Sequence, residues 1–441
     1  MRGTRWAAWL PVLVFVGTAL VYSATISRLP SYDATTANMV SWNIANTGSP
    51  DVALTDFPGF NGLSTRDGWL VHDAHGHEMI GRAPGVIAAS VPAYLLAGRG
   101  AFTVVPGALT AALLTAAAMA WLFWLLAQLV PTRVALQAVL VLGFTTPVWT
   151  VAADAMWPHS LTLLGMVGMA VCARSDRWWM VGFWGGFAAT GRLHVAIVCL
   201  VLAVGCSWQR RRWAPMLQAG AIGLLWIGAI SLWTHWMYGR WDPTSGYVAS
   251  KFVDYAAGHR FDLVNLLGFL VSPHRGLLVW TPVLVLLLPA LARGWRELPD
   301  WTRWLALGGG VYLLVQGLLN RFSGGFFFYG YRLPLETLVC VTPALVLSRE
   351  HCGRVARALF APLVILQGAL VIPGALTDLY TPPVDSWTTN ALWYWFTRKP
   401  VAIAGLVLAS GLATALAVRL AGARTVTEPA EAEPQRVESG P

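Results

Sequence analysis

Long apolar runs alternate with short polar or basic segments along almost the whole chain. The first run covers residues 7–26 without a single charge, and about 20 apolar residues suffice for a helix to cross a bilayer core of about 30 Å. Comparable runs follow at 102–129, 134–150, 160–171, 178–190, 193–207, 217–236, 276–291, 305–319, 333–347, 359–376 and 401–421. The pattern predicts an all-α, polytopic transmembrane bundle of about 12 helices. Continuous rather than alternating apolar runs disfavour a membrane β-barrel.

The arginines between these runs predict the orientation of the bundle. Arg2 and Arg5 precede the first run, and positive residues favour the cytoplasmic side. The N-terminus is therefore expected in the cytoplasm and residues 28–100 in a first outer loop. Residues 84–97 are apolar but short, and counting them as a crossing would reverse every later arginine-rich loop. We expect two short juxtamembrane helices in this loop, at 34–46 and 84–97, lying at the outer interface.

Composition places the whole chain in the membrane class. It is 56% hydrophobic and 12% charged, whereas soluble domains carry about 25% charged residues. The net charge of +9 comes almost entirely from arginine near the apolar runs, which indicates contact with anionic membrane lipids and not with nucleic acid. Richness in Arg, Ala and Trp suggests a bacterial plasma membrane protein. One transmembrane domain is expected over residues 1–421, and a Glu- and Pro-rich, disordered cytoplasmic tail over residues 422–441.

Asp33 lies a few residues beyond the first apolar run, at the start of the long polar loop. A carboxylate fixed at this boundary can act as a base on a substrate that arrives from water, beside a lipid that enters from the bilayer. The alternative is structural, because Asp is a favoured N-cap and a short helix is expected to begin at Ala34. A capping side chain can also face a cavity, so the two roles are compatible.

Further ionisable and aromatic residues fall at the outer ends of the predicted helices. Such groups are costly near a membrane and their default interpretation is a functional site. Arginines suit a phosphate group because they offer forked hydrogen bonds and charge. The substrate-binding candidates are Arg82, Asp154, His159, Arg192, Tyr247, Arg275, Tyr331 and Arg332.

No cofactor is expected. Residues 72–78 contain histidines at alternating positions, which can ligate a divalent metal, but the spacing of a helical metalloenzyme motif is missing. A hydrated polar loop is therefore the preferred interpretation, and no metal ligand is assigned. A glycine-rich phosphate loop between a strand and a helix is also missing, so a nucleotide is not expected as direct substrate.

Several segments, taken in order, resemble one known superfamily. They are Asp33; Arg82-Ala83-Pro84-Gly85; Trp157-Pro158-His159; Thr190-Gly191-Arg192; the segment from Tyr238 to Tyr247; Ser272-Pro273-His274-Arg275-Gly276; and Gly330-Tyr331-Arg332. In this order the chain resembles the GT-C superfamily of membrane glycosyltransferases, in particular the bacterial polyprenyl-phosphate-dependent members, which are similar to dolichyl-phosphate-mannose mannosyltransferases. It departs from their pattern in having only Asp154 where two acids often occur, and in lacking a soluble outer domain after the last helices.

The resemblance implies an inverting glycosyltransferase, either a hexosyl- or a pentosyltransferase. The sugar would move from a polyprenyl-phosphate donor to a glycan or glycolipid acceptor in the cell envelope, on the outer face, with Asp33 as general base. Three alternatives remain open. They are a lipid-linked saccharide ligase, a transporter or flippase of lipid-linked sugars, and a membrane protein that performs no chemistry.

Overall fold

The computed structural model describes residues 3–28, 31–52, 57, 70–247, 262–325, 327–382 and 384–422. Nearly all of the tail expected at 422–441 therefore lies outside the described residues. The predicted all-α bundle is confirmed. The apolar runs form α1 (Gly3–Ala24), α4 (Val105–Ala127), α5 (Thr132–Phe144), α6 (Pro158–Arg174), α7 (Trp178–Gly191), α8 (Ala196–Arg210), α9 (Ala214–Tyr238), α13 (Leu284–Gly294), α14 (Asp300–Leu319), α15 (Leu335–Leu347), α16 (Arg354–Leu376) and α18 (Pro400–Gly422).

Within the described ranges, five helical segments are long and apolar enough to cross a membrane by themselves. They are α4, α9, α16, most of α18, and Leu193–Arg210, which joins the short turn η4 (Leu193–Val195) to α8. The chain is thus a multi-pass membrane protein. The exact number of crossings stays a prediction.

Two of the runs that the sequence presents as continuous are broken by proline. The run at 134–150 divides into α5 and a π-helical turn, η3 (Val148–Ala152), with Pro147 between them. The run at 276–291 divides into α12 (Leu277–Trp280) and α13, with Pro282 between them. Proline has no N–H to donate and clashes with the preceding turn. The prediction of unbroken helices was wrong at these two places.

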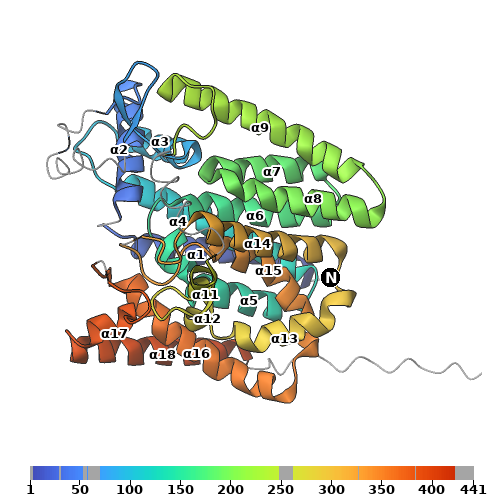
Figure 1. The fold of residues 1–441 in the computed structure, drawn as a ribbon. Coiled ribbons are helices and arrows are strands. Elements are labelled where there is room, and N and C mark those ends of the chain that lie inside the picture. The colour runs from blue at the N-terminus through green and yellow to red at the C-terminus, as the bar shows by residue number, and fades with distance from the viewer. Residues whose placement is uncertain are drawn as a thin grey trace, which may run out of the picture.

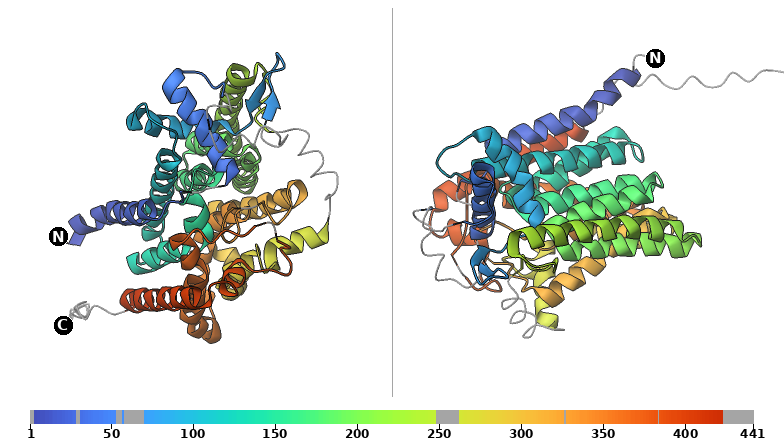
Figure 2. Two further views of the ribbon diagram at one scale, coloured as in Figure 1. Left: turned by 90° about the vertical axis from the view of Figure 1, so that its left-hand side faces the viewer. Right: turned by 90° about the horizontal axis from the view of Figure 1, so that it is seen from above.

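Two helices lie across one end of the bundle. The long helices run side by side, and α2 (Tyr32–Thr47) and α3 (Pro84–Ala97) lie across their ends (Figures 1 and 2). We call this the α2 end; α1 begins at the opposite end (Figure 1). The two short helices expected in the first loop are confirmed, α3 with the predicted bounds.

The surroundings of α2 differ from the expectation of a helix lying on the membrane. Residues 34–41 are all buried, and Ser41 Oγ donates to the Ile87 carbonyl of α3 over 2.9 Å. Small side chains on α2 permit this close packing. The α2 end also carries a short antiparallel hairpin of β1 (Leu70–His72) and β2 (Glu78–Ile80). The remaining short helices are α11 (Leu263–Val271), α17 (Ala391–Phe396), η5 (Trp295–Glu297) and η6 (Ser348–His351).

The central helix is α6, in which residues 159–173 are all buried. Glycines on it allow α7 to approach closely. A Cβ added at Gly165 would lie 2.6 Å from the Cβ of Ala188, which is closer than two carbon atoms tolerate. Because burial begins at His159, the N-terminal turn of α6 lies inside the bundle and is surrounded by protein.

Candidate functional site

Asp33 lies between two arginines that come from distant parts of the chain. Its Oδ1 is 3.4 Å from Arg82 Nη2 and its Oδ2 is 3.3 Å from Arg332 Nη1. The Asp33 side chain is 35% exposed, whereas those of Arg82 and Arg332 are 15% and 16% exposed. Asp33 is therefore the most exposed of the three side chains, and the two arginines are covered more completely by protein. We call these three residues the Asp33 cluster.

The capping interpretation of Asp33 is not what the structure shows. Ser31 is the N-cap residue of α2, and Asp33 is inside the first helical turn. A negative charge in the first turn still interacts favourably with the helix dipole. The carboxylate, however, points to guanidinium groups and is not used as a cap.

Arg82 is held by its own neighbourhood as well as by the carboxylate. It comes from the segment between β2 and α3. Its Nε donates to the Asp33 carbonyl (3.1 Å) and to Thr36 Oγ1 (2.9 Å), and its Nη1 donates to the Gly81 carbonyl (2.6 Å). Nη2, which faces Asp33, has almost no surface in contact with solvent. Arg82 thus fixes α2 to the start of α3 and presents one nitrogen to Asp33.

Arg332 lies against aromatic rings. Its guanidinium carbon is 4.7 Å from the centre of the Trp157 ring and 5.3 Å from that of Phe328, and the two rings meet edge to face at 6.1 Å. A guanidinium that stacks on aromatic faces loses little freedom when it binds an anion. Trp157 immediately precedes α6, so the central helix supports this arginine.

Arg275 holds the loop from which Arg332 projects. Its Nη1 donates to the carbonyls of Phe328 (3.0 Å) and Gly330 (2.6 Å), and its guanidinium carbon lies 3.8 Å from the centre of the Phe328 ring. The side chain is fully buried. Burial, together with the positive charge of Arg332, lowers the pKa of Arg275 well below its usual value. The observed contacts of Arg275 are with the loop.

The Asp33 cluster carries a net charge of +1, because one carboxylate faces two guanidinium groups. Both arginines are largely covered by protein, so their charge is screened less than that of surface groups. Such a site attracts an anion. Phosphate fits this geometry because its oxygens accept forked hydrogen bonds from arginine.

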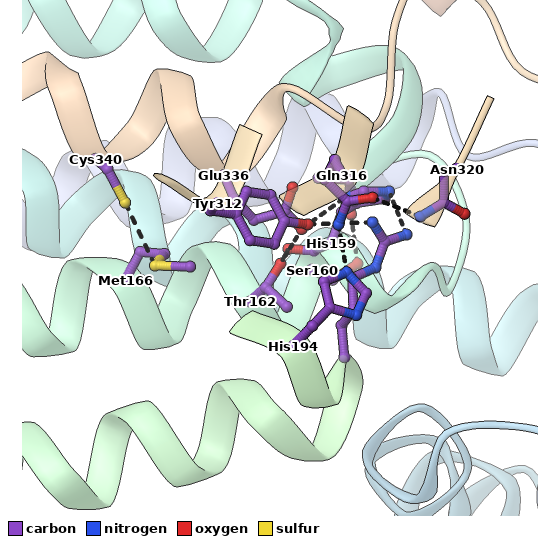
Figure 3. A network of polar contacts seen from close by, with 12 residues as sticks. His159, Ser160, Thr162, Met166, His194, Tyr312, Gln316, Asn320, Glu336 and Cys340 are labelled. Atoms are coloured by element: carbon purple, nitrogen blue, oxygen red, sulfur yellow. Dashed lines mark hydrogen bonds and ion pairs between the residues drawn. The ribbon is translucent and has the colours of Figure 1, made fainter. Parts of the chain in front are cut away.

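A second polar cluster surrounds a fully buried ion-pair position inside the bundle (Figure 3). His159 Nδ1 is 2.9 Å from Glu336 Oε1, with both side chains 0% exposed, and Thr162 Oγ1 donates to the same oxygen over 2.8 Å. Arg192 donates to Tyr312 Oη over 3.2 Å, and its Nη2 lies 3.4 Å from His159 Nε2. Three further residues continue the network, namely His194, Gln316 and Asn320.

The two clusters meet at the N-termini of α6 and α15. Arg332 and Glu336 lie four positions apart at the start of α15, and Trp157 and His159 lie two positions apart at the start of α6. His159 and Glu336 belong to the first turns of α6 and α15, and Trp157 and Arg332 lie just before these helices. The buried pair of Glu336 and His159 therefore helps to fix the position of Arg332 over Trp157.

The observed contacts of the other predicted residues are with parts of the protein other than the Asp33 carboxylate. Asp154 is 7% exposed and accepts from Tyr380 Oη over 3.1 Å; burial and the charge of Asp378 raise its pKa well above the usual value. Tyr331 is buried, and its hydroxyl is 2.7 Å from Thr281 Oγ1. Tyr247 accepts a hydrogen bond from the Leu193 amide. Their contact with substrate stays a prediction.

Glu336 and Tyr312 were not among the predicted residues. Both lie within apolar runs, where the sequence analysis treated them as parts of a crossing. A lone glutamate in a membrane helix is nevertheless a signal, because such a group needs a buried partner.

The histidine-rich segment forms the turn of the β1–β2 hairpin. Asp73 Oδ1 accepts from the amides of His75 and His77, and Asp73 Oδ2 lies 3.1 Å from His77 Nδ1. Among the residues that the structure describes, no group of three or more His, Cys, Asp or Glu side chains has the arrangement of a metal site. The carboxylate here organises the turn.

Comparison with known proteins gives a match in fold. No family model and no curated protein matches the sequence. The chain is similar to the crystal structure of ArnT from Cupriavidus metallidurans bound to undecaprenyl phosphate, with a TM-score of 0.55, 16% identity, and coverage of 93% of this chain and 72% of ArnT. Apo ArnT from the same organism matches with a TM-score of 0.50 and 16% identity, over 96% of this chain and 76% of ArnT. The match shows that this chain has the ArnT fold, and it confirms the expected polytopic helical architecture.

Proposed function

We propose that this chain is an integral membrane glycosyltransferase that moves a sugar from a polyprenyl-phosphate donor to a glycan or glycolipid acceptor. The observation that carries the proposal is the Asp33 cluster, a carboxylate between two arginines at one end of a bundle with the ArnT fold. Fold alone does not determine activity. The cluster adds the two chemical functions that this transfer needs, an anion site and a base.

Arg82 and Arg332 bind the phosphate of the donor. When the bond between the sugar and the phosphate breaks, negative charge grows on the phosphate oxygens, and guanidinium groups already in place stabilise that charge. The undecaprenyl phosphate bound to ArnT supports a polyprenyl phosphate as the carrier. Trp157 and Phe328 keep Arg332 oriented. The positive charge comes from the chain itself, so no metal is required for this role.

Asp33 takes the proton of the acceptor hydroxyl. The acceptor oxygen then forms a bond to the anomeric carbon, and the bond from that carbon to the phosphate oxygen breaks. The electron pair leaves with the carrier phosphate, and one direct displacement inverts the anomeric carbon. A positioned carboxylate typically contributes a factor of about 10² to 10⁴ to such a step. Whether the sugar is a hexose or a pentose is set by the walls of the site.

The site faces the outside of a bacterial plasma membrane in this proposal, and the N-terminus is cytoplasmic. Two features support it. The start of α1 lies at the end of the bundle away from α2, and so does the connection between α8 and α9, which contains Arg211 and Arg212 (Figure 1). Positive residues favour the cytoplasmic side.

A transporter of lipid-linked sugars is the second candidate. The buried pair of Glu336 and His159 favours it, because ionisable groups inside a membrane bundle often mark a transport path. The two functions differ in their products. A transporter returns the lipid-linked sugar unchanged on the other side, whereas a transferase releases the free carrier phosphate.

The test is an assay of the purified protein in liposomes with synthetic undecaprenyl-phosphate sugars and envelope glycolipids. We expect release of undecaprenyl phosphate. Arg332→Lys should lower turnover about tenfold or more, because a point charge replaces a fork. Arg398→Lys is the matched control, since Arg398 is an exposed arginine stacked on Tyr394 of α17. Movement of intact donor across the bilayer without release of carrier phosphate would contradict the proposal.

A further inference from the structure

We propose that Asp33 occupies the phosphate-binding position of the Asp33 cluster when no donor is present, and that donor binding displaces the carboxylate. This inference rests on the proposed function, in which Arg82 and Arg332 hold the carrier phosphate. It adds that Asp33 and the phosphate compete for the same guanidinium groups. Asp33 thus becomes available as a base only after the donor has bound.

The hydrogen-bond donors of Arg82 favour competition between Asp33 and the phosphate over a bridge in which Arg82 binds both. Its Nε is used by the Asp33 carbonyl and by Thr36, and one of the two N–H groups on its Nη1 is used by the Gly81 carbonyl. Nη2 faces Asp33 Oδ1 at 3.4 Å and has almost no contact with solvent. A phosphate that approaches from solvent therefore reaches Nη2 only if the carboxylate moves.

Asp33 can make this movement without a change in the backbone. Its side chain is 35% exposed, more than either arginine, and it lies in the first turn of α2, where the neighbouring residues 34–41 are buried and fixed. Rotation about two side-chain bonds takes the carboxylate toward solvent, where an acceptor hydroxyl arrives. The arginines need not move far, since Arg332 is stacked on rings and Arg82 is bound to α2.

Competition lowers the apparent affinity for the phosphate, because only the fraction of molecules with a displaced carboxylate can bind. Partly exposed ion pairs are individually weak. With two of them on one carboxylate, we expect the empty enzyme to be in the competent state about one tenth of the time, so the apparent Kd is raised about tenfold. Asp33→Asn removes the charge that competes and keeps the size of the side chain.

The experiment measures binding of undecaprenyl phosphate to the full-length protein in nanodiscs at physiological ionic strength. Asp33→Asn should bind this probe about tenfold more tightly than wild type. Asp51→Asn is the matched control, since Asp51 is an exposed carboxylate just beyond the other end of α2, and it should bind like wild type. Equal or weaker binding by Asp33→Asn would overturn the proposal and would mean that the arginines bridge carboxylate and phosphate.

A double-mutant cycle separates competition from simple repulsion between two anions. In an Arg332→Gln background, competition predicts that the gain from Asp33→Asn falls to about threefold or less, because one of the shared cations is gone. The same tenfold gain in both backgrounds would overturn competition in favour of repulsion. The proposed function fails by a different result, namely wild-type affinity for the probe in both Arg82→Gln and Arg332→Gln.

Discussion

Replacement of Arg275 by methionine tests whether this arginine supports the loop or binds the donor. The variant removes two charge-assisted hydrogen bonds, to the carbonyls of Phe328 and Gly330. Bonds of this kind contribute about 1.5–3 kcal/mol each. The variant also removes a buried charge, and this relief offsets part of the loss. We expect the free energy of unfolding to fall by about 2–4 kcal/mol.

The loop has particular need of this support. Gly324, Gly325 and Gly330 all have positive φ angles, and so does Phe327. Without Arg275, the loop loses its ties on both sides of Tyr329, and Arg332 moves away from Trp157. Transfer should then fall together with stability.

The assay is thermal and denaturant unfolding in detergent, combined with donor KM. Arg275→Lys should be intermediate, since one ammonium group can donate to one or both carbonyls. Unchanged stability of Arg275→Met together with a raised KM for the donor would refute the loop role and show that Arg275 contacts the phosphate.

Three further predictions concern other parts of the molecule. Glu336→Ala should lower stability by about 3–5 kcal/mol, because it leaves the buried guanidinium of Arg192 without a nearby carboxylate and removes the acceptor of His159 and Thr162. Glu336→Gln should lower it by less, as unfolding in detergent would show. Asp154→Asn should have a higher melting temperature than wild type, and this difference should grow from pH 5 to pH 8. Because the pKa of Asp154 is raised in the folded state, its contribution to stability is full below the unfolded pKa of about 3.9 and is lost as pH rises. The same pH dependence of the melting temperature in both proteins would contradict its buried position. Cysteines placed at the exposed positions His75 and Arg212 should react with an impermeant maleimide from opposite sides of the membrane, since the five native cysteines are buried; reaction of both from one side would overturn the topology.

The sequence predicts the helices well because membrane segments are long and uniformly apolar. The bounds of α3 agree with the prediction, since Pro84 begins the helix and Gly98 follows its last residue. The breaks at Pro147 and Pro282 were missed because apolar residues on both sides conceal them in a hydropathy pattern. Proline within a predicted crossing indicates a possible break in the helix, which mean hydropathy does not detect.

The site was only partly predictable. Asp33 and Arg332 were both candidates, yet 299 positions separate them in the chain. Periodicity and spacing contain no information on such a pairing. The role of Arg275 also depends on which carbonyls lie nearby, and backbone carbonyls are the same in every sequence. Glu336 was missed because an apolar run conceals a single charge, whereas the buried partner His159 is visible only in three dimensions.

The turnover of Asp33→Asn with an undecaprenyl-phosphate sugar tests the central claim most directly. Asparagine keeps the size of the side chain and removes its basicity, and Asp33 is not the N-cap of α2. The account predicts a folded protein that binds undecaprenyl phosphate more tightly than wild type but transfers sugar about 10²-fold more slowly or worse. Transfer at the wild-type rate by this variant would contradict the account, because Asp33 could then not be the base.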